Sequence, residues 1–209
     1  MAVKANHDIS SGLDTAFINS AINSNLAYRP EFVSNDYTQG KKVSVAIERE
    51  LRHCDAFYIS VAFITEGGLA PLKQVLAELR DKGIPGKILT TSYLTFTEPK
   101  ALKTLADLSN VEVRVYDSTD EGASGFHTKG YIFKEEEIYR FIVGSSNMTA
   151  SAFSVNKEWN TKLVSTSDGE LLKQMMTEFN ALWNSKHTLA VKDFIEDYEV
   201  RYRLIKEQK

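Results

Sequence analysis

The stretch GFHTKGYIF at residues 125–133 decides the fold, together with GSSN at 144–147 and EWN at 158–160. Each stretch contains two polar residues separated by a single residue: His127 and Lys129, Ser145 and Asn147, Glu158 and Asn160. On a β-strand, residues two apart lie on the same face, so each pair can direct both side chains to one place. The adjoining runs at 131–133 and 141–143 are apolar and β-prone, which predicts buried strands that present a polar site.

The composition is that of an ordinary globular domain. The chain has 209 residues, of which 43% are hydrophobic and 25% are charged. Cys54 is the single cysteine, which excludes an intramolecular disulfide framework and a cysteine-rich zinc site and fits a reducing, cytoplasmic setting. No apolar segment approaches the length of a membrane span, so we expect no membrane association. A formal charge of −3 gives no general basic surface, and binding of nucleic acid would depend on a local patch.

Three parts can be distinguished along the chain. Residues 1–40 are polar and interrupted by glycine and proline, which predicts an arm or linker with one short amphipathic helix at 14–23 and an irregular connection at 28–40. Residues 41–190 alternate helical and strand patterns and form the main domain. The charged run at 191–209 predicts a last helix or a linker toward a downstream region of a longer protein.

The main domain reads as alternating helices and strands. Helices are expected at 43–52, 66–81, 99–108, 149–155 and 168–185, with Pro99 in a first helical turn and Asp168 as an N-cap. Strands are expected at 56–64, 87–92, 111–116, 127–133, 139–145 and 159–164. This alternation predicts an α/β sandwich in which helices cover both faces of a mixed sheet.

The motifs resemble those of a known family. HTKGYIF followed by GSSN is similar to the HxK…GSxN signature of the phospholipase D-like superfamily, the HKD phosphodiesterases. That pattern continues with an Asp five residues after the Lys, where this chain has Lys134, and the departure favours a nuclease-like branch over a lipid-hydrolysing one. The phrases at 57–65, 89–93 and 156–160 look like those of the phospholipase D-like domain at the front of some bacterial DEAD/DEAH-box helicases. The resemblance runs from about Lys41 to His187.

The resemblance implies a role for each polar residue, beside a plainer alternative. His127 would be the nucleophile or general acid, because an imidazole can do both at neutral pH, and Lys129 would hold the phosphate oxygens rather than lie solvated on the surface. Ser145 and Asn147 would add hydrogen-bond donors, or simply form a strand-ending turn. Glu158 would orient a histidine, as the acid of a serine-protease triad does, or form an ion pair with Lys157.

Other residues carry weaker signals. Asn160, Thr91 and Ser92 are candidate substrate contacts, the latter two because ligands often bind where strands of an open α/β sheet end. Trp159 is expected to point away from the site and pack in the core. We interpret the remaining histidines as solvated or structural: His7, His53 and His187.

The implied function is a metal-independent phosphodiesterase or nuclease that needs no cofactor and acts through a phosphohistidine. The mechanism requires two histidines, and the chain has one motif, so the resemblance implies a homodimer with a shared site. Nucleic acid, DNA rather than RNA, is the expected substrate, and a helicase motor is a further expected partner. A catalytically weak module for DNA binding or dimerisation is the main alternative, and a lipid phosphodiesterase ranks third.

Overall fold

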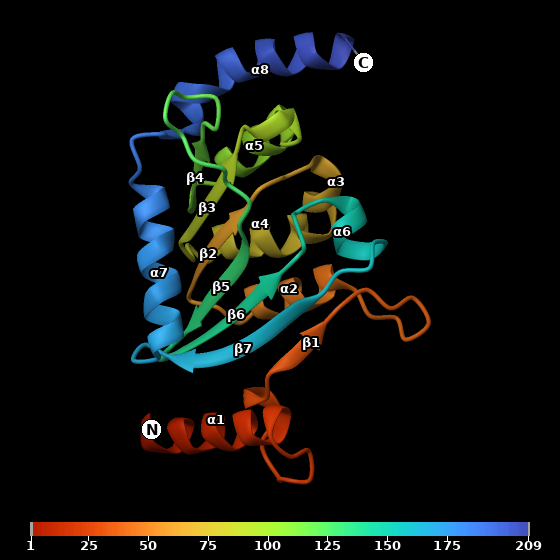
Figure 1. Cartoon of the computed structure of the whole chain (residues 1–209), viewed down its shortest axis with the longest axis vertical. Helices are drawn as coiled ribbons and strands as arrows, with labels where there is room; N and C mark the ends of the chain where they lie inside the picture. The colour runs from red at the N-terminus through yellow and green to blue at the C-terminus, as the bar shows by residue number, and fades with distance from the viewer. Residues whose placement is uncertain (1, 209) are drawn as a thin grey trace.

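The computed structural model describes residues 2–208, which form one eight-stranded mixed sheet between helices (Figure 1). The strand order is β1-β7-β6-β5-β2-β3-β4-β8. Strands β2, β3 and β4 are parallel, and the other pairings are antiparallel. The strands span β1 Glu31–Val33, β2 Ala56–Val61, β3 Gly86–Thr91, β4 Val111–Tyr116, β5 Lys129–Glu135, β6 Ile138–Gly144, β7 Asn160–Thr166 and β8 Thr188–Ala190.

The connections explain the two strand directions. Helical crossovers link β2 to β3 and β3 to β4, as parallel neighbours require. A tight turn joins β5 to β6, with Glu136 in the left-handed region at φ 52°. The α-helices span α1 Ala2–Phe17, α2 Val43–Leu51, α3 Glu66–Leu69, α4 Lys73–Asp81, α5 Pro99–Ala106, α6 Ala150–Ser154, α7 Glu170–Trp183 and α8 Val191–Glu207, with short 3-10 turns η1 Leu26–Tyr28, η2 Ala70–Leu72 and η3 Tyr93–Thr95.

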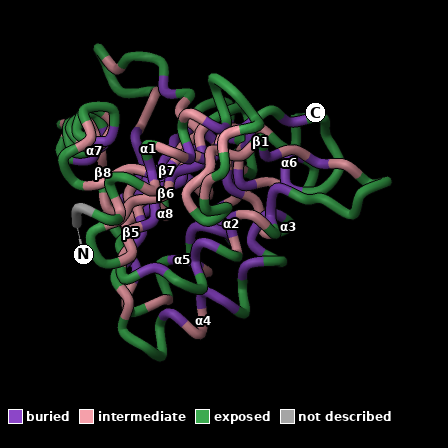
Figure 2. Tube along the Cα trace, turned by 90° about the horizontal axis from the view of Figure 1, so that it is seen from below, coloured by how far each residue is buried: buried purple, intermediate pink, exposed green. Residues whose placement is uncertain are grey.

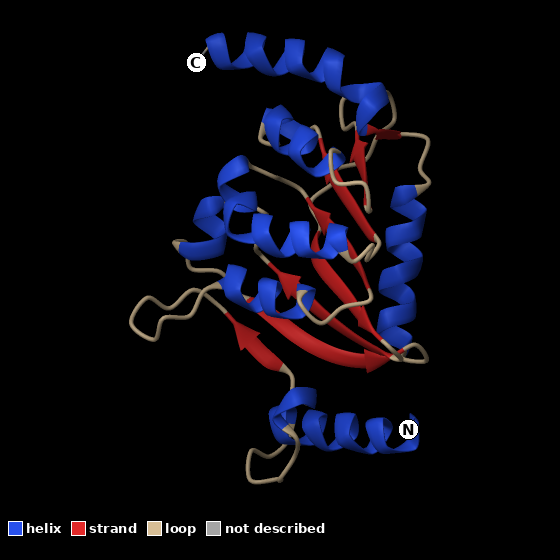
Figure 3. Cartoon of the chain, turned by 180° about the vertical axis from the view of Figure 1, so that it is seen from behind, coloured by secondary structure: helices blue, strands red, loops and turns tan. Residues whose placement is uncertain are grey.

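The two faces of the sheet are covered unequally (Figure 3). Helices α2, α4, α5, α6 and the start of α8 enclose the main core on one face. Helix α7 covers the other face, where Phe179, Trp183 and Leu172 pack on strand residues such as Leu89, Ile132 and Phe141. The buried stretches lie in the interior and the exposed ones on outer turns (Figure 2). The expected α/β sandwich with a mixed sheet is therefore confirmed.

The first 40 residues differ from the prediction. The helix expected at 14–23 is instead α1, which spans Ala2–Phe17. The Thr15 hydroxyl lies 2.8 Å from the carbonyl of Ile22, in the turn that follows the helix. The irregular connection expected at 28–40 contains β1, which pairs with β7. The arm is thus joined to the sheet by an edge strand, while α1 lies at the end of the molecule opposite α8 (Figure 1).

Two further details correct the expected elements. The N-cap of α7 is Gly169, and Asp168 makes no capping hydrogen bond there. Residues 188–190 form the edge strand β8, which the sequence pattern did not indicate because three residues are too short to show alternation. No helix among the described residues combines the length and apolarity needed to cross a membrane.

A buried lysine ties the β1 edge to the main core. The side chain of Lys162 on β7 is buried, and its Nζ lies 2.6 Å from Glu31 Oε1 on β1 and 3.3 Å from Glu50 Oε1 on α2. Burial alone would raise the pKa of Glu31, but hydrogen bonds and charge from Lys162 and Arg49 outweigh it and hold the pKa below its usual value. The contribution of Glu31 to stability is therefore present above its unfolded pKa and is lost as pH falls through its folded pKa.

Replacement of Lys162 by Met should reduce the free energy of unfolding by about 1.5–3 kcal/mol, because it removes a charged hydrogen-bond partner from the buried carboxylate of Glu50, which keeps only Arg49 at 3.3 Å and Arg140 at 3.8 Å among the described residues. Urea denaturation at neutral pH measures this change. The matched control is Lys173→Met, which removes an exposed pair with Asp168 at 3.9 Å and should cost at most about 1 kcal/mol. Equal losses for the two variants would contradict the assigned role of Lys162.

Candidate active site

The polar motifs meet on the side of the sheet where the central strands end, here called the sheet edge, and not at the outer strands β1 and β8. The register pairs Val61 at the end of β2 with Lys129 at the start of β5. On the other side of the site, Gly144 at the end of β6 pairs with Asn160 at the start of β7. Since β5 and β6 are themselves paired, four strand ends converge, and those of β5, β6 and β7 bring predicted site residues to the same place.

His127 and Lys129 contact each other directly. Lys129 Nζ lies 2.6 Å from His127 Nδ1 and donates to the His127 carbonyl at 2.9 Å. His127 is exposed and precedes β5 instead of lying within it, so the two do not form the expected same-face strand pair. They converge because the long lysine side chain reaches back along the chain. Thr128 holds this position, since its carbonyl accepts from Ala62 N at 3.0 Å and its hydroxyl bonds to Ser60 Oγ at 2.6 Å.

The contact with Lys129 decides which ring nitrogen of His127 carries the proton. A charged lysine can only donate a hydrogen bond, so Nδ1 accepts and the proton of the neutral imidazole is on Nε2. The ring also lies edge-on to Phe63, at 5.8 Å between ring centroids and an interplanar angle of 84°. Burial lowers the pKa of Lys129, and the charge of Glu158 partly opposes that shift. The lysine is therefore a cation that loses its proton at lower pH than an ordinary lysine does.

Ser145 and Asn147 follow the end of β6. The hydroxyl of Ser145 donates to Glu158 Oε2 and accepts from the backbone N–H of Trp159 at 3.0 Å. Asn147 Oδ1 accepts from the backbone N–H of Phe63 at 3.1 Å, which orients the amide next to β2. Among the described residues, the amide NH2 of Asn147 has no hydrogen-bond partner, so it can donate to a bound oxyanion.

Glu158 is buried, and it is not the surface ion-pair partner of Lys157. Its carboxylate accepts the hydroxyl of Ser145, and its charge acts on Lys129 and on the buried Tyr131, whose pKa is raised by burial first and by Glu158 second. Within the described residues no hydrogen bond joins Glu158 to His127. The structure therefore places Glu158 next to the site without the histidine contact that the sequence suggested.

Asn160 supports the site from below. Its amide donates to the Val33 carbonyl at 3.1 Å and to Ser146 Oγ at 2.9 Å, while its oxygen accepts from the Ser146 N–H at 3.2 Å. The side chains of Asn160 and Ser146 are buried. These contacts hold the turn between Ser145 and Asn147, so the geometry favours a positioning role. Sequence reasoning missed Ser146, although its place within GSSN was a usable signal.

Thr91 and Ser92 are not brought to the His127 cluster. Both are buried on the β4 side of β3, two strands from β5. Thr91 donates to the Tyr116 carbonyl at 2.9 Å, and Ser92 donates to Asp117 Oδ1 at 2.7 Å. A substrate contact by these hydroxyls stays a prediction that these hydrogen bonds do not favour.

Trp159 was predicted to pack in the core, and this is wrong. Its side chain is 75% exposed, because β7 begins only at Asn160 and the residue before it lies at the rim of the site. The other histidines lie elsewhere, as expected. His53 and His7 are exposed, and the buried His187 bonds to Asp120 at 2.6 Å.

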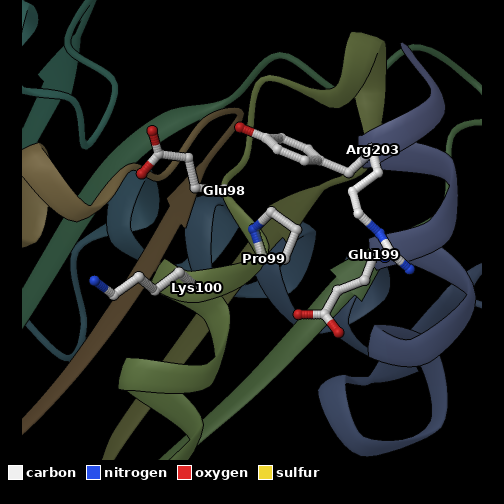
Figure 4. A pocket seen from close by; sticks show the side chains of 6 residues that line it. Glu98, Pro99, Lys100, Glu199 and Arg203 are labelled. Carbon is white, nitrogen blue, oxygen red and sulfur yellow. The ribbon is translucent and has the colours of Figure 1, made fainter. Parts of the chain in front are cut away.

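A separate cleft of about 570 Å³ lies between α5 and α8 (Figure 4). Its lining is Glu98, Pro99, Lys100, Glu199, Tyr202 and Arg203, none of them a predicted site residue. Figure 4 shows side chains of α8 facing the start of α5. In the described part of the chain, no group of three or more His, Cys, Asp or Glu side chains is arranged to hold a metal ion.

Comparison with known proteins decides the family. The model of the family described as "Cardiolipin synthase, PLD-like domain" matches residues 53–183, well over half of the chain. The chain belongs to this family. The match contains every residue of the sheet-edge cluster, which consists of His127, Lys129, Ser145, Asn147, Glu158 and Asn160. This cluster is therefore part of the phospholipase D-like domain itself. No curated protein matches the chain by sequence.

Solved structures with the same fold agree with this assignment. Nuc, a phospholipase D family member from Salmonella typhimurium, superposes with a TM-score of 0.57 at 16% identity, covering 78% of this chain and 98% of its own. NucT from Helicobacter pylori gives 0.58 at 14% identity with the same coverage. A phosphatidylserine synthase from Haemophilus influenzae superposes with a TM-score of 0.57 at 15% identity, covering 86% of this chain and 44% of its own. At these identities the likeness concerns the fold.

The departure at Lys134 lies far from the cluster. Lys134 is five residues further along β5 than Lys129, or about 17 Å at the usual rise of a strand. It sits beside the far end of β2, where its carbonyl accepts from Asp55 N at 2.7 Å. The missing Asp of the phospholipase D-like pattern therefore removes no group from the sheet-edge cluster.

Gly144 allows β6 and β7 to approach closely at the site. A Cβ on Gly144 would lie 2.1 Å from the Trp159 carbonyl oxygen and 2.6 Å from Asn160 Cα, both backbone atoms. We expect Gly144→Ala to lower the free energy of unfolding by about 1–3 kcal/mol, the usual cost of overpacking. Thermal and urea unfolding measure it. Gly125→Ala is the control, because a Cβ there meets nothing within 4 Å; a loss at Gly125 as large as that at Gly144 would contradict the explanation.

Proposed function

We propose that this phospholipase D-like domain is a metal-independent phosphodiesterase that acts on nucleic acid. The observation that carries the proposal is the direct contact of 2.6 Å between His127 and Lys129 at an exposed sheet edge. A nucleophile or general acid and a phosphate-binding cation are thus held together by adjacent backbone. The amide of Asn147 and the Ser145–Glu158 pair surround them.

A bound phosphodiester would change the hydrogen bonding of His127. The anionic oxygens attract the ammonium of Lys129, which then leaves Nδ1 of the imidazole. The proton can move to Nδ1, and the unprotonated Nε2 becomes the nucleophile toward phosphorus. Nε2 forms a bond to phosphorus as the bond to the leaving oxygen breaks, which yields a phosphohistidine. Lys129 and the amide of Asn147 stabilise the charge that develops on the remaining oxygens.

The leaving oxygen needs a proton from a second group. The phospholipase D-like motif is present once in this chain, so we propose that a second copy supplies its own His127 across a twofold axis. That histidine gives its Nε2 proton to the leaving alkoxide. It then takes a proton from the water that hydrolyses the phosphohistidine, and both imidazoles return to their starting forms. The exposed position of His127 at the sheet edge supports this arrangement.

We also propose the setting of this activity. The resemblance to the front domain of bacterial helicases supports a role next to a helicase motor, with DNA as the substrate. The phrases that carry the resemblance lie on β2, at the end of β3 and at the start of β7, all around the sheet edge. A cytoplasmic location fits the single buried, reduced Cys54.

His127→Asn should reduce cleavage of a DNA oligonucleotide in excess EDTA by at least about 100-fold, the lower end of the contribution of a general acid or base. The full chain is used, and product formation is followed by gel electrophoresis. His53→Asn is the matched control, since His53 is exposed and, among the described residues, its side chain bonds only to the Arg49 carbonyl. Full activity of the His127 variant would refute the proposal. Light scattering that shows only monomers under assay conditions would refute the shared site.

The lowered pKa of Lys129 gives a prediction for pH dependence. As pH rises, Lys129 becomes neutral earlier than an ordinary lysine does. The decrease in kcat/KM should therefore begin at a pH lower than the usual lysine pKa. Lys129→Arg keeps its charge at alkaline pH, and its residual activity, relative to its own value at neutral pH, should persist further. Superimposable alkaline profiles would contradict this. Circular dichroism over the same range checks that the fold is intact.

One observation favours a second candidate, hydrolysis of a lipid phosphodiester. A largely apolar cavity of about 430 Å³ lies between the sheet and α7, and Lys129 and Thr128 are part of its lining together with Met175 and Phe179. Such a cavity next to a phosphate site can accept part of an acyl chain. Release of headgroup from phosphatidylglycerol vesicles by the parent chain, abolished in His127→Asn, with no cleavage of DNA would select this candidate.

A further inference from the structure

Aromatic side chains flank the polar cluster on both sides along the sheet edge. The strand order β1-β7-β6-β5-β2-β3 places the residues that follow β3 and β2 on one side of His127, and those of β1 and the start of β7 on the other. Phe96 and Phe63 belong to the first group, and Trp159 and Phe32 to the second. The sheet-edge cluster therefore lies between two aromatic surfaces.

The first surface is connected to His127 itself. Phe63 lies edge-on to the imidazole at 5.8 Å and edge-on to Phe96 at 4.9 Å between ring centroids. Phe96 is 43% exposed and Tyr93 is 41% exposed. A continuous row of rings thus leads from the proposed nucleophile to the surface.

The second surface is next to Glu158 and Ser145. Trp159 is 75% exposed and Phe32 is 62% exposed, and the two rings pack edge-on at 5.7 Å. The backbone of Trp159 pairs with Ser145 through Ser145 N–H to the Trp159 carbonyl at 3.1 Å and Trp159 N–H to Ser145 Oγ at 3.0 Å. The backbone of Trp159 is therefore fixed beside the cluster, while its indole ring stays accessible.

The loop that presents the first surface has an unfavourable backbone conformation. Leu94 and Thr95 both have positive φ, 50° and 54°, which residues other than glycine seldom adopt. Surrounding contacts hold this shape: the buried Thr97 bonds to the carbonyls of Thr91 and Ala62, and Tyr198 on α8 donates to the Thr97 carbonyl at 2.7 Å. Such conformations persist where the surroundings impose them, and they cluster at ligand sites. Here the result is an outward-facing row of apolar side chains.

We infer that the two aromatic surfaces stack unpaired bases on either side of the phosphate at His127, so that the substrate is a single strand that runs across the strand ends. This inference rests on the proposed function and names its substrate class. Aromatic rings bind bases of any sequence when the bases are unstacked, whereas a duplex keeps its bases inside.

The chain contains its own probe for this binding. Its two tryptophans are Trp159 and Trp183, and Trp183, the last residue of α7, is buried and stacks on Phe179 of the same helix. Tryptophan fluorescence should therefore be quenched when a base stacks on Trp159. The experiment titrates oligothymidylate, and a duplex of equal length, into the full chain carrying His127→Asn to limit turnover. Fluorescence anisotropy of labelled DNA gives the affinities of variants at Phe96, Trp159 and Phe17, including those that lack the fluorescent Trp159.

Single strands should bind more tightly than the duplex and quench the fluorescence. Phe96→Ala and Trp159→Ala should each weaken single-strand binding by about 5- to 150-fold, the range for loss of one stacked base, and leave duplex binding unchanged. Trp159→Phe should retain most of the affinity, which separates stacking from misfolding. Phe17→Ala is the control and should have no effect, because Phe17 is the exposed last residue of α1. Helix α1 lies at the end of the molecule opposite α8 (Figure 1).

Three results would overturn the inference: equal affinity for single strand and duplex, unchanged affinity in the two alanine variants, or a change of oligomeric state in these variants without a change in binding. The last would assign the aromatic surfaces to contact between two copies. The proposed function fails separately, because cleavage that survives His127→Asn refutes the mechanism and leaves the binding comparison valid.

Discussion

Strand β2 pairs in parallel with β3 on one side and antiparallel with β5 on the other, and the position of the site depends on this change of direction. Because β5 runs against β2, its first residue, Lys129, lies opposite the last residue of β2, Val61. The β5-β6-β7 meander then returns to the same edge. A shift of one residue in the β2–β5 register would break the contacts of Thr128 with Ala62 and Ser60 and turn the start of β5 to the other face relative to β2. The apolar residues of β2, Phe57, Ile59 and Val61, pack in the main core and oppose such a shift.

The fold was largely predictable from the sequence, and the exceptions have physical reasons. Strands β2 to β7 are long and apolar enough to show their pattern, and their existence was predicted. The edge strands β1 and β8 have three residues each and little buried surface, so their pairing is decided by β7 and β4 and not by their own sequence. Helix α1 is polar along much of its length, and it packs through a few residues such as Ile9, so its boundaries left only a weak periodic signal.

The members of the site were predictable as residues but not as contacts. His127 and Lys129 are two residues apart, and their contact is local. Glu158 is thirteen residues from Ser145, and only the β6–β7 register brings the two together. Spacing could not show that Glu158 would bond to this serine instead of the histidine. Trp159 illustrates the same limit: alternation along a strand predicts burial, but at a strand end the neighbouring layer stops and the side chain meets solvent.

The hydrogen bond from Tyr198 to the Thr97 carbonyl connects α8 directly to the segment that carries Phe96. The ring of Tyr198 is buried, whereas the helix continues outward past α5 and borders the cleft of Figure 4. Glu98, which follows Thr97 and lines that cleft, is bonded through its backbone N–H to the Ile64 carbonyl at 2.8 Å, one residue after Phe63. A ligand in the cleft and a substrate at the sheet edge would thus act on opposite ends of one short segment. If both ligands changed the conformation of this segment, their binding free energies would be coupled, and the coupling would be reciprocal.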